Sequence, residues 1–281
     1  MPQAQFGVYV GRFQPLHDAH LATILSALDQ VDNLFIIVGS AHRTRNIKNP
    51  FTVDERIEMI SACLTAEQLK RVSFVPVRDY LYTPNRWYAD VQQKVSALVA
   101  AWTQESPSPR IVIIGHEKNA SSEYLRCFPQ WERIEVPLMP GINAADIRNL
   151  YFGTHRADIK NVPAPVAKWL DKFRKTKHYT DLSEEHAMIQ AYRASWSVAP
   201  FPPMFVTVDA VVIKSGHVLV VRRKGRRGKG TIALPGGFLN ANEFIADGAL
   251  RELKEETGIK VPLDVLKGSI AGTQVFDDPT R

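Results

Sequence analysis

The sequence predicts an α/β protein of two domains, in which a parallel sheet covered by helices precedes a smaller α+β domain. Over the first 180 residues, short apolar runs alternate with stretches of helical periodicity, a rhythm typical of parallel sheets. A Pro-rich segment at residues 200–203 then breaks the pattern, and runs rich in β-branched residues follow it. A length of 281 residues suits two domains. We therefore predict a first domain at 1–180, a helical and Pro-rich linker at 181–204 and a second domain at 205–281.

In the linker, Ser183 is predicted to cap a helix of about Glu184–Ser195. The second domain is predicted to open with a hairpin, in which strands Phe205–Ile213 and His217–Arg222 are joined by a turn at Ser215 and Gly216.

Five apolar runs are predicted to be the strands of the first sheet. They are Phe6–Val10, Leu34–Val38, Val72–Val75, Arg110–Ile114 and Ile134–Val136. Ligands of such sheets bind beyond the carboxyl ends of the strands. The residues that directly follow each run are therefore the candidate site residues of the first domain.

The segment from Gly11 to His20 joins the first strand to a helix that includes Leu21–Leu28. The start of a helix leaves backbone N–H groups unpaired and carries partial positive charge, which favours phosphate. Gly11 allows a close approach to the backbone, and Pro15 stiffens the turn. His17 and His20 are three residues apart, so on a helix both imidazoles lie on one side and can donate to phosphate oxygens. The alternative is two ordinary histidines of a surface turn.

A basic loop and a capped helix follow the second strand. Thr52 is predicted to begin the helix, with Glu55 completing a capping box. The cations of the loop can reach the phosphates of a ligand, or they form a mobile basic loop and no more. The loop residues of interest are Ser40, Arg43, Arg45 and Lys48.

Further candidates follow the other strands. Trp87 lies early in the helix after the third strand, where an indole can stack on a flat cationic ring or pack in the core. His116 follows the fourth strand. After the fifth, Asn143 can cap a helix, and Arg148 can bind phosphates or form a surface ion pair.

These segments resemble a known family. The stretch from Gly11 to Pro15, followed by His17 and His20, is similar to the signature of archaeal-type nicotinamide mononucleotide (NMN) adenylyltransferases, in the nucleotidyltransferase superfamily. The segments 49–56, 116–122 and 141–148 resemble further elements of the same family. Some positions depart from its pattern, namely Ala19 for Gly, Asn119 for Asp, Asn143 for Ser and Ala145 for Thr.

The resemblance implies a Rossmann-like nucleotidyltransferase domain and Mg²⁺-assisted transfer of the adenylyl group of ATP to NMN, giving NAD and pyrophosphate. Catalysis would rest on positioning and charge stabilisation, with no covalent intermediate. His17, His20 and Arg148 are the expected catalytic residues. The resemblance places ATP against Gly11, Arg12, Phe13, Gln14, His17, His20, Asn143 and Arg148, and NMN against Ser40, Lys48, Trp87 and His116.

The second domain carries a long motif. Gly237, Glu243 and the run from Arg251 to Ile259 form the pattern G-x(5)-E-x(7)-R-E-U-x-E-E-x-G-U, where U is a bulky apolar residue. A helix over residues 246–257 places its apolar side chains on one face and three carboxylates on another. Gly258 is predicted to end that helix. Crowded carboxylates favour a hard divalent cation between them, and the alternative is a solvated acidic helix.

This pattern resembles the Nudix hydrolases. It implies that Glu252, Glu255 and Glu256 bind Mg²⁺, with Mn²⁺ as an alternative, and that Glu255 and Glu256 are catalytic. Arg251 is expected to orient a glutamate rather than to touch substrate. The sequence stops at Arg281, soon after the motif, so we expect the Nudix domain to be truncated at its carboxyl end.

Together the two halves resemble the bifunctional NMN adenylyltransferase/Nudix proteins of bacterial NAD metabolism, which implies ADP-ribose as the substrate of the second domain. Two alternatives stay open. The first domain could adenylylate another phosphate acceptor. The Nudix half could instead be a non-catalytic sensor of ADP-ribose or NAD.

Composition limits the remaining possibilities. Hydrophobic residues make up 45% and charged residues 23% of the chain, as in soluble globular proteins, and the net charge of +6 suits anionic ligands. Two cysteines, Cys63 and Cys127, form no disulfide framework. The basic run at 222–229 is interpreted as a solvated loop. We expect a cytoplasmic protein that takes small-molecule substrates, with no membrane or nucleic-acid partner; homo-oligomer formation stays open.

Overall fold

The computed structural model describes residues 4–102, 109–116, 124–136, 139–153, 159–201, 203–225 and 228–276. It divides into two compact units, Met1–Ala187 and Met188–Arg281. The predicted boundaries at residues 180 and 204 stay predictions.

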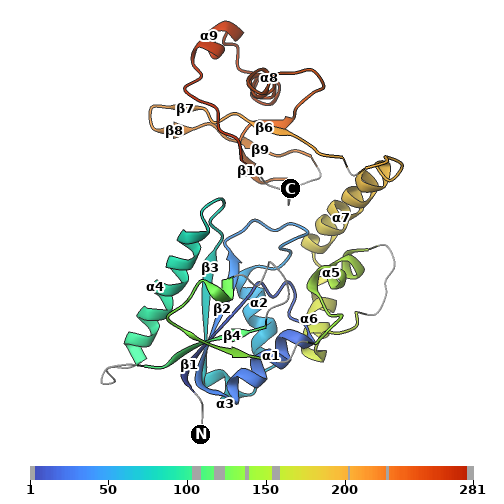
Figure 1. Cartoon of the computed structure of the whole chain (residues 1–281). Helices are drawn as coiled ribbons and strands as arrows, with labels where there is room; N and C mark the ends of the chain where they lie inside the picture. Colours follow the sequence, from blue (N-terminus) through green and yellow to red (C-terminus); the bar gives the residue numbers. More distant parts are fainter. Residues whose placement is uncertain are drawn as a thin grey trace. The chain divides into compact units, whose positions relative to one another are not determined.

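The first unit is built on a five-stranded sheet in which every pairing is parallel (Figure 1). Its strand order is β3-β2-β1-β4-β5, so the first strand lies in the middle. All five predicted strands are confirmed. They span Ala4–Gly11 (β1), Val31–Ala41 (β2), Val72–Arg78 (β3), Ile111–Gly115 (β4) and Glu132–Glu135 (β5).

Helices cover both faces of this sheet, as Figure 1 shows. One apolar core gathers Ile24, Met59 and Leu170 against one face. A second core packs Val91 and Val95 against the other face. The helices of this unit are α1 (Asp18–Leu28), α2 (Val53–Ser61), α3 (Ala66–Lys70), α4 (Pro84–Trp102), α5 (Ala144–Phe152) and α6 (Ala164–Phe173).

Helix α7 (Lys177–Ser195) begins earlier than the sequence predicted. We expected a helix from residue 184 with Ser183 as its cap, and this prediction is wrong because Ser183 lies inside the helix. The additional turns are supported by an ion pair between Lys177 and Asp181, whose Nζ and Oδ2 atoms are 2.7 Å apart. Tyr179 also packs against the core of the first unit. Among the described residues, no helix is both long enough and apolar enough to cross a bilayer.

The second unit pairs short antiparallel strands and packs α8 (Ile245–Thr257) beside them. The predicted turn at Ser215 and Gly216 is confirmed, with both residues at positive φ. The predicted strands around it are broken into shorter pieces. The pairs are β6 (Thr207–Asp209) with β11 (Gly236–Phe238), β7 (Ile213–Lys214) with β8 (His217–Val218), and β9 (Val221–Arg222) with β10 (Ile232–Ala233); α9 (Leu263–Gly268) follows α8.

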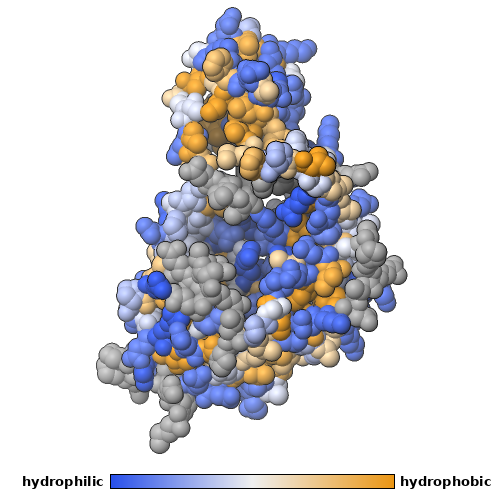
Figure 2. All heavy atoms as spheres, turned by 45° about the vertical axis from the view of Figure 1, so that its right-hand side comes forward, coloured by the Kyte–Doolittle hydropathy of each residue, from blue (hydrophilic) through white to orange (hydrophobic). Residues whose placement is uncertain are grey.

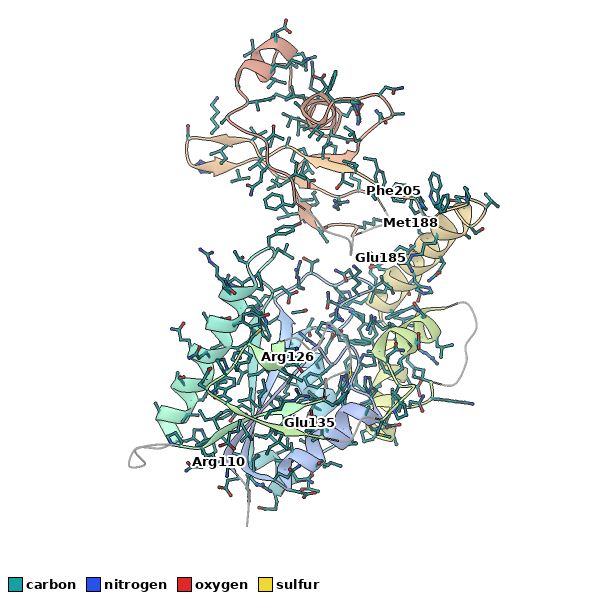
Figure 3. The ribbon with its side chains drawn as sticks, in the orientation of Figure 1. Arg110, Arg126, Glu135, Glu185, Met188 and Phe205 are labelled. Atoms are coloured by element: carbon teal, nitrogen blue, oxygen red, sulfur yellow. The ribbon has the colours of Figure 1, made fainter. Side chains whose placement is uncertain are left out.

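Aromatic side chains form a small cluster in the second unit. Phe205, labelled in Figure 3, packs against Trp196 and Tyr192, whose ring centroids lie 5.4 and 5.7 Å from its own, and against Phe238, whose centroid is 5.4 Å away. Apolar side chains are also exposed on this unit, including Ile213, and Figure 2 shows apolar atoms gathered on its visible face.

Candidate active sites

The turn after β1 is held in shape by the packing of one of its own side chains, Phe13. Phe13 adopts φ 51° and is 1% exposed, and its ring fills the space beside Gly11. A Cβ at Gly11 would lie 2.6 Å from that ring, so glycine is required by packing. The ring of Phe13 also meets the ring of His20 edge-on, with centroids 4.9 Å apart. Phe13 therefore positions the turn, and its predicted contact with ATP stays a prediction.

His17 and His20 lie together at the start of α1. His17 is the N-cap, and its Nδ1 accepts a hydrogen bond from the backbone N–H of His20 at 3.4 Å. The two imidazole rings stack, with centroids 3.5 Å apart and planes inclined by 17°. Because Nδ1 of a neutral His17 is the acceptor, its proton resides on Nε2. The paired arrangement predicted from the sequence is present, with His17 capping the helix rather than lying within it.

Gln14 and Arg148 connect this turn to the rest of the site. The buried Gln14 side chain donates to the carbonyl of Phe51 and accepts from its N–H, both at 2.9 Å. Arg148 donates to the backbone carbonyl of Gln14 at 2.8 Å. Burial, reinforced by the charge of Arg12, lowers the pKa of Arg148 to about 10. Arg148 therefore stays a cation at neutral pH beside the histidine turn.

Arg56 is a residue that sequence reasoning missed. It is 1% exposed, and its guanidinium donates to three backbone carbonyls, those of Arg12 at 2.7 Å, Gly39 at 2.6 Å and Thr52 at 3.1 Å. The first carbonyl belongs to the turn that follows β1, and the second lies near the carboxyl end of β2. Burial is the main cause that lowers its pKa to about 10. Its place in the segment that resembles the family element at 49–56 was the available signal.

The end of β2 and the loop after it are held by Asp79, which directly follows β3. Its carboxylate accepts from Ser40 Oγ at 3.1 Å and from Arg43 Nε at 2.9 Å. Ser40 adopts φ 49°, a strained conformation that this contact supports. Arg45 forms an ion pair within the protein: its two terminal nitrogens donate to the carboxylate of Glu55 at 2.6 and 3.0 Å. The predicted capping box of Thr52 and Glu55 is confirmed.

The remaining candidates of the first unit lie at the same carboxyl edge of the sheet. Lys48 is exposed on its loop. Trp87 is half-buried, with its ring centroid 6.3 Å from that of Tyr124. Trp87 thus packs against neighbouring aromatic rings, and its stacking on nicotinamide stays a prediction. His116 directly follows β4, and Asn119 lies outside the described residues. Asn143 caps α5, accepting from the N–H of Asp146 at 2.9 Å, as predicted.

In the second unit, Arg251 of α8 organises the acidic residues. Its Nε donates to Glu243 at 2.8 Å, and one terminal nitrogen reaches Glu252 at 2.7 Å and Glu255 at 3.2 Å. These contacts agree with the expectation that Arg251 orients glutamates. The hydrogen bonds from Arg251 lower the pKa of Glu243. Gly258 ends the helix in the left-handed conformation at φ 67°, as predicted.

Two glycines bring the acidic face of α8 close to β11. A Cβ at Gly237 would lie 2.5 Å from Oε1 of Glu252, so a larger residue would displace that carboxylate. The N–H of Gly236 donates to Glu256 at 3.1 Å. Carboxylate oxygens of this kind fit a hard divalent cation. Within the described residues, however, no three acidic, His or Cys side chains gather as a metal site, and Arg251 bonds one carboxylate oxygen of Glu252.

Comparison with known proteins finds a matching family model for each unit. Residues 8–135 match the family model described as Cytidylyltransferase-like, and residues 203–281 match that of the NUDIX domain. Over 180 residues the chain is 37% identical to the nicotinamide/nicotinic acid mononucleotide adenylyltransferase of Acinetobacter baylyi, covering 64% of this chain and 92% of that protein. It is 43% identical over 83 residues to the nicotinamide-nucleotide adenylyltransferase of Saccharolobus solfataricus, covering 29% of this chain and 48% of that relative.

A solved structure resembles nearly the whole chain. It is a bifunctional NMN adenylyltransferase/ADP ribose pyrophosphatase from Francisella tularensis, complexed with AMP and a manganese ion. The sequence identity is 36% and the TM-score is 0.88, covering 99% of this chain and 80% of that chain.

Fold, site geometry and these likenesses define the class, a nucleotidyltransferase domain followed by a Nudix domain. Within that class, the chain belongs to the NMN adenylyltransferase family, in the bifunctional form that also carries a Nudix domain.

Proposed function

We propose that the first unit transfers the adenylyl group of ATP to the phosphate of NMN, giving NAD and pyrophosphate. The observation that carries this proposal is the stacked pair His17 and His20 at the start of α1, with Arg148 bonded to the same turn through Gln14. Imidazole N–H donors, a helix start and a guanidinium meet the needs of a triphosphate.

The residues of this site act through position and charge. As the α-phosphorus becomes five-coordinate, His17 and His20 hold its oxygens, and Arg148 takes up charge on the departing pyrophosphate. Asn143 and the backbone of the turn from Gly11 to Gln14 complete the ATP site. A bound Mg²⁺ or Mn²⁺ supplies charge neutralisation between phosphate oxygens.

Ser40, Lys48, Trp87 and His116 are proposed for NMN. Ser40 is fixed by Asp79, and Trp87 presents an indole at the start of α4. A flat pyridinium cation favours an indole face, which supports NMN over acceptors without such a ring. Profiling with NMN, nicotinate mononucleotide and phosphopantetheine separates these acceptors.

For the second unit we infer hydrolysis of ADP-ribose to AMP and ribose 5-phosphate. Support comes from the complete motif on α8, from the room that Gly237 leaves for Glu252, and from the likeness to the bifunctional Francisella protein. Glu252, Glu255 and Glu256 supply the oxygen ligands for Mg²⁺ or Mn²⁺, which activates water for attack on phosphorus.

A second candidate role for this unit is a sensor of ADP-ribose or NAD. It is favoured by the contacts of Glu252 and Glu255 with Arg251, which occupy one oxygen of each of these two proposed ligands.

One pair of incubations tests both activities. The intact chain with ATP, NMN and Mg²⁺ is expected to form NAD, and with ADP-ribose and Mg²⁺ or Mn²⁺ to release AMP. His20→Ala should abolish only the first reaction. No NAD from the unmodified chain overturns the transferase proposal, and ADP-ribose that binds but survives intact supports the sensor.

A further inference from the structure

A second polar recess lies in the first unit, apart from the histidine turn. It has a volume of about 290 Å³ and is lined by His42, Arg78, Tyr80, Asp90 and Lys94. His42 follows β2, Arg78 ends β3, and Asp90 and Lys94 come from α4. None of these residues belongs to the predicted ATP or NMN contacts. The sheet edge and the helix thus bring together polar side chains of the segment 78–94 with His42, which is distant in the sequence.

The two cations of this recess are held in place before any ligand arrives. Lys94 Nζ donates to the carbonyl of Pro76 at 2.9 Å and to Asp90 Oδ2 at 3.1 Å. The guanidinium of Arg78 lies over the ring of Tyr80, 4.8 Å from its centroid. Cations that are already ordered lose less conformational entropy when they bind an anion.

Charge and size define the class of ligand. The charges of Arg78 and Lys94 exceed that of Asp90 by one positive charge. The lining offers N–H and O–H donors and little apolar surface, so it suits a charged ligand. Its volume is at the lower end of small-molecule sites, which start at about 300 Å³. We propose that this recess binds a phosphate-bearing small molecule at a site separate from the histidine turn.

The recess is connected to the proposed acceptor site by one residue. Asp79 lies between Arg78 and Tyr80 in the chain, and its carboxylate holds Ser40 Oγ at 3.1 Å. A ligand that moves Arg78 or Tyr80 therefore moves the support of Ser40. Occupancy of the recess should change the KM for NMN more than kcat. This second consequence rests on the proposed function, whereas the binding itself does not.

Calorimetry on the intact chain tests the binding with inorganic phosphate and pyrophosphate as probes, at constant ionic strength set with chloride. We expect Arg78→Ala and Lys94→Gln each to weaken one class of phosphate site about tenfold, because each removes a charge-assisted contact. His20→Ala should weaken a different class. Lys70→Gln is the matched control, since Lys70 is an exposed lysine of α3 paired with Glu67.

Two results decide the proposal. If Arg78→Ala and Lys94→Gln bind both probes as the unmodified chain does, the recess is no phosphate site. Because Arg78 is exposed, its substitution leaves the fold intact, so Arg78→Ala keeps the test valid if Lys94→Gln fails to fold. Should the chain form no NAD, the calorimetric result still stands. Should phosphate change the KM for NMN equally in Arg78→Ala, the connection through Asp79 is wrong.

Discussion

Arg56→Met tests how the candidate transferase site is assembled. The substitution keeps a long apolar stem but removes the guanidinium that donates to the carbonyls of Arg12, Gly39 and Thr52. The hydrogen bond to Gly39 is buried, while water can partly replace the donors to the other two. A buried acceptor left unpaired costs about 1–3 kcal/mol, and the partly accessible bonds contribute about 1 kcal/mol each. We expect the free energy of unfolding to fall by about 3–5 kcal/mol.

The effect on activity should exceed the effect of lost stability. Without Arg56, the turn after β1 is no longer joined to the carboxyl end of β2, so Arg12 and Ser40 lose their fixed positions. Misplacement by about 1 Å can reduce turnover about 100-fold. Arg56→Lys keeps the charge but lacks the planar fork, so it should recover only part of the loss. Urea unfolding followed by tryptophan fluorescence gives the stability, and NAD formation per folded molecule gives the activity.

Arg71→Met is the matched control for this prediction. Arg71 also donates to three backbone carbonyls, those of Asp32 at 2.8 Å, Leu28 at 2.6 Å and Val31. These carbonyls lie at the opposite end of β2 from the candidate site. Arg71→Met should therefore lower stability with little change in activity per folded molecule. Equal activity losses in the two variants, or full activity in Arg56→Met, would refute the positioning role.

Three further predictions concern the second unit. Glu256→Gln should remove metal-dependent release of AMP from ADP-ribose while NAD synthesis continues, because the two sites use different residues; loss of both reactions would contradict this. Gly237→Ala should also lower hydrolysis, since its Cβ displaces the Glu252 carboxylate that lies 2.5 Å away, and a metal titration should show weaker binding. The pairing of Glu243 with Arg251 lowers the pKa of Glu243 in the folded chain. The stabilisation from this pairing is therefore fully present above the pKa of an unfolded glutamate, and it is lost as the pH falls through the lower pKa of the folded state. An NMR titration that finds an ordinary pKa for Glu243 would exclude this pairing.

Local patterns predicted much of this structure. The five parallel strands follow from apolar runs, the caps at Thr52 and Asn143 from residue type, and the end of α8 at Gly258 from its glycine. Each of these features depends on neighbours within a few residues. The same holds for the pairing of His17 with His20, which the spacing fixes.

Contacts between distant segments could not be predicted in this way. Arg56 reads as an ordinary surface cation until the fold brings the carbonyls of Arg12 and Gly39 to it. The resemblance places Gln14 against ATP, but nothing in the local sequence indicates that both hydrogen bonds of its side-chain amide go to Phe51. The start of α7 was misplaced because Ser183 suggested a cap, while tertiary packing of Tyr179 extends the helix.

The most direct test of the account follows phosphorus through the reaction. The chain is incubated with NMN, Mg²⁺ and ATP labelled at the α-phosphorus, and the products are separated. Attack of the NMN phosphate on that atom predicts that the label enters NAD and that pyrophosphate carries none. Label in pyrophosphate, or release of labelled AMP without NAD, would contradict adenylyl transfer at this site.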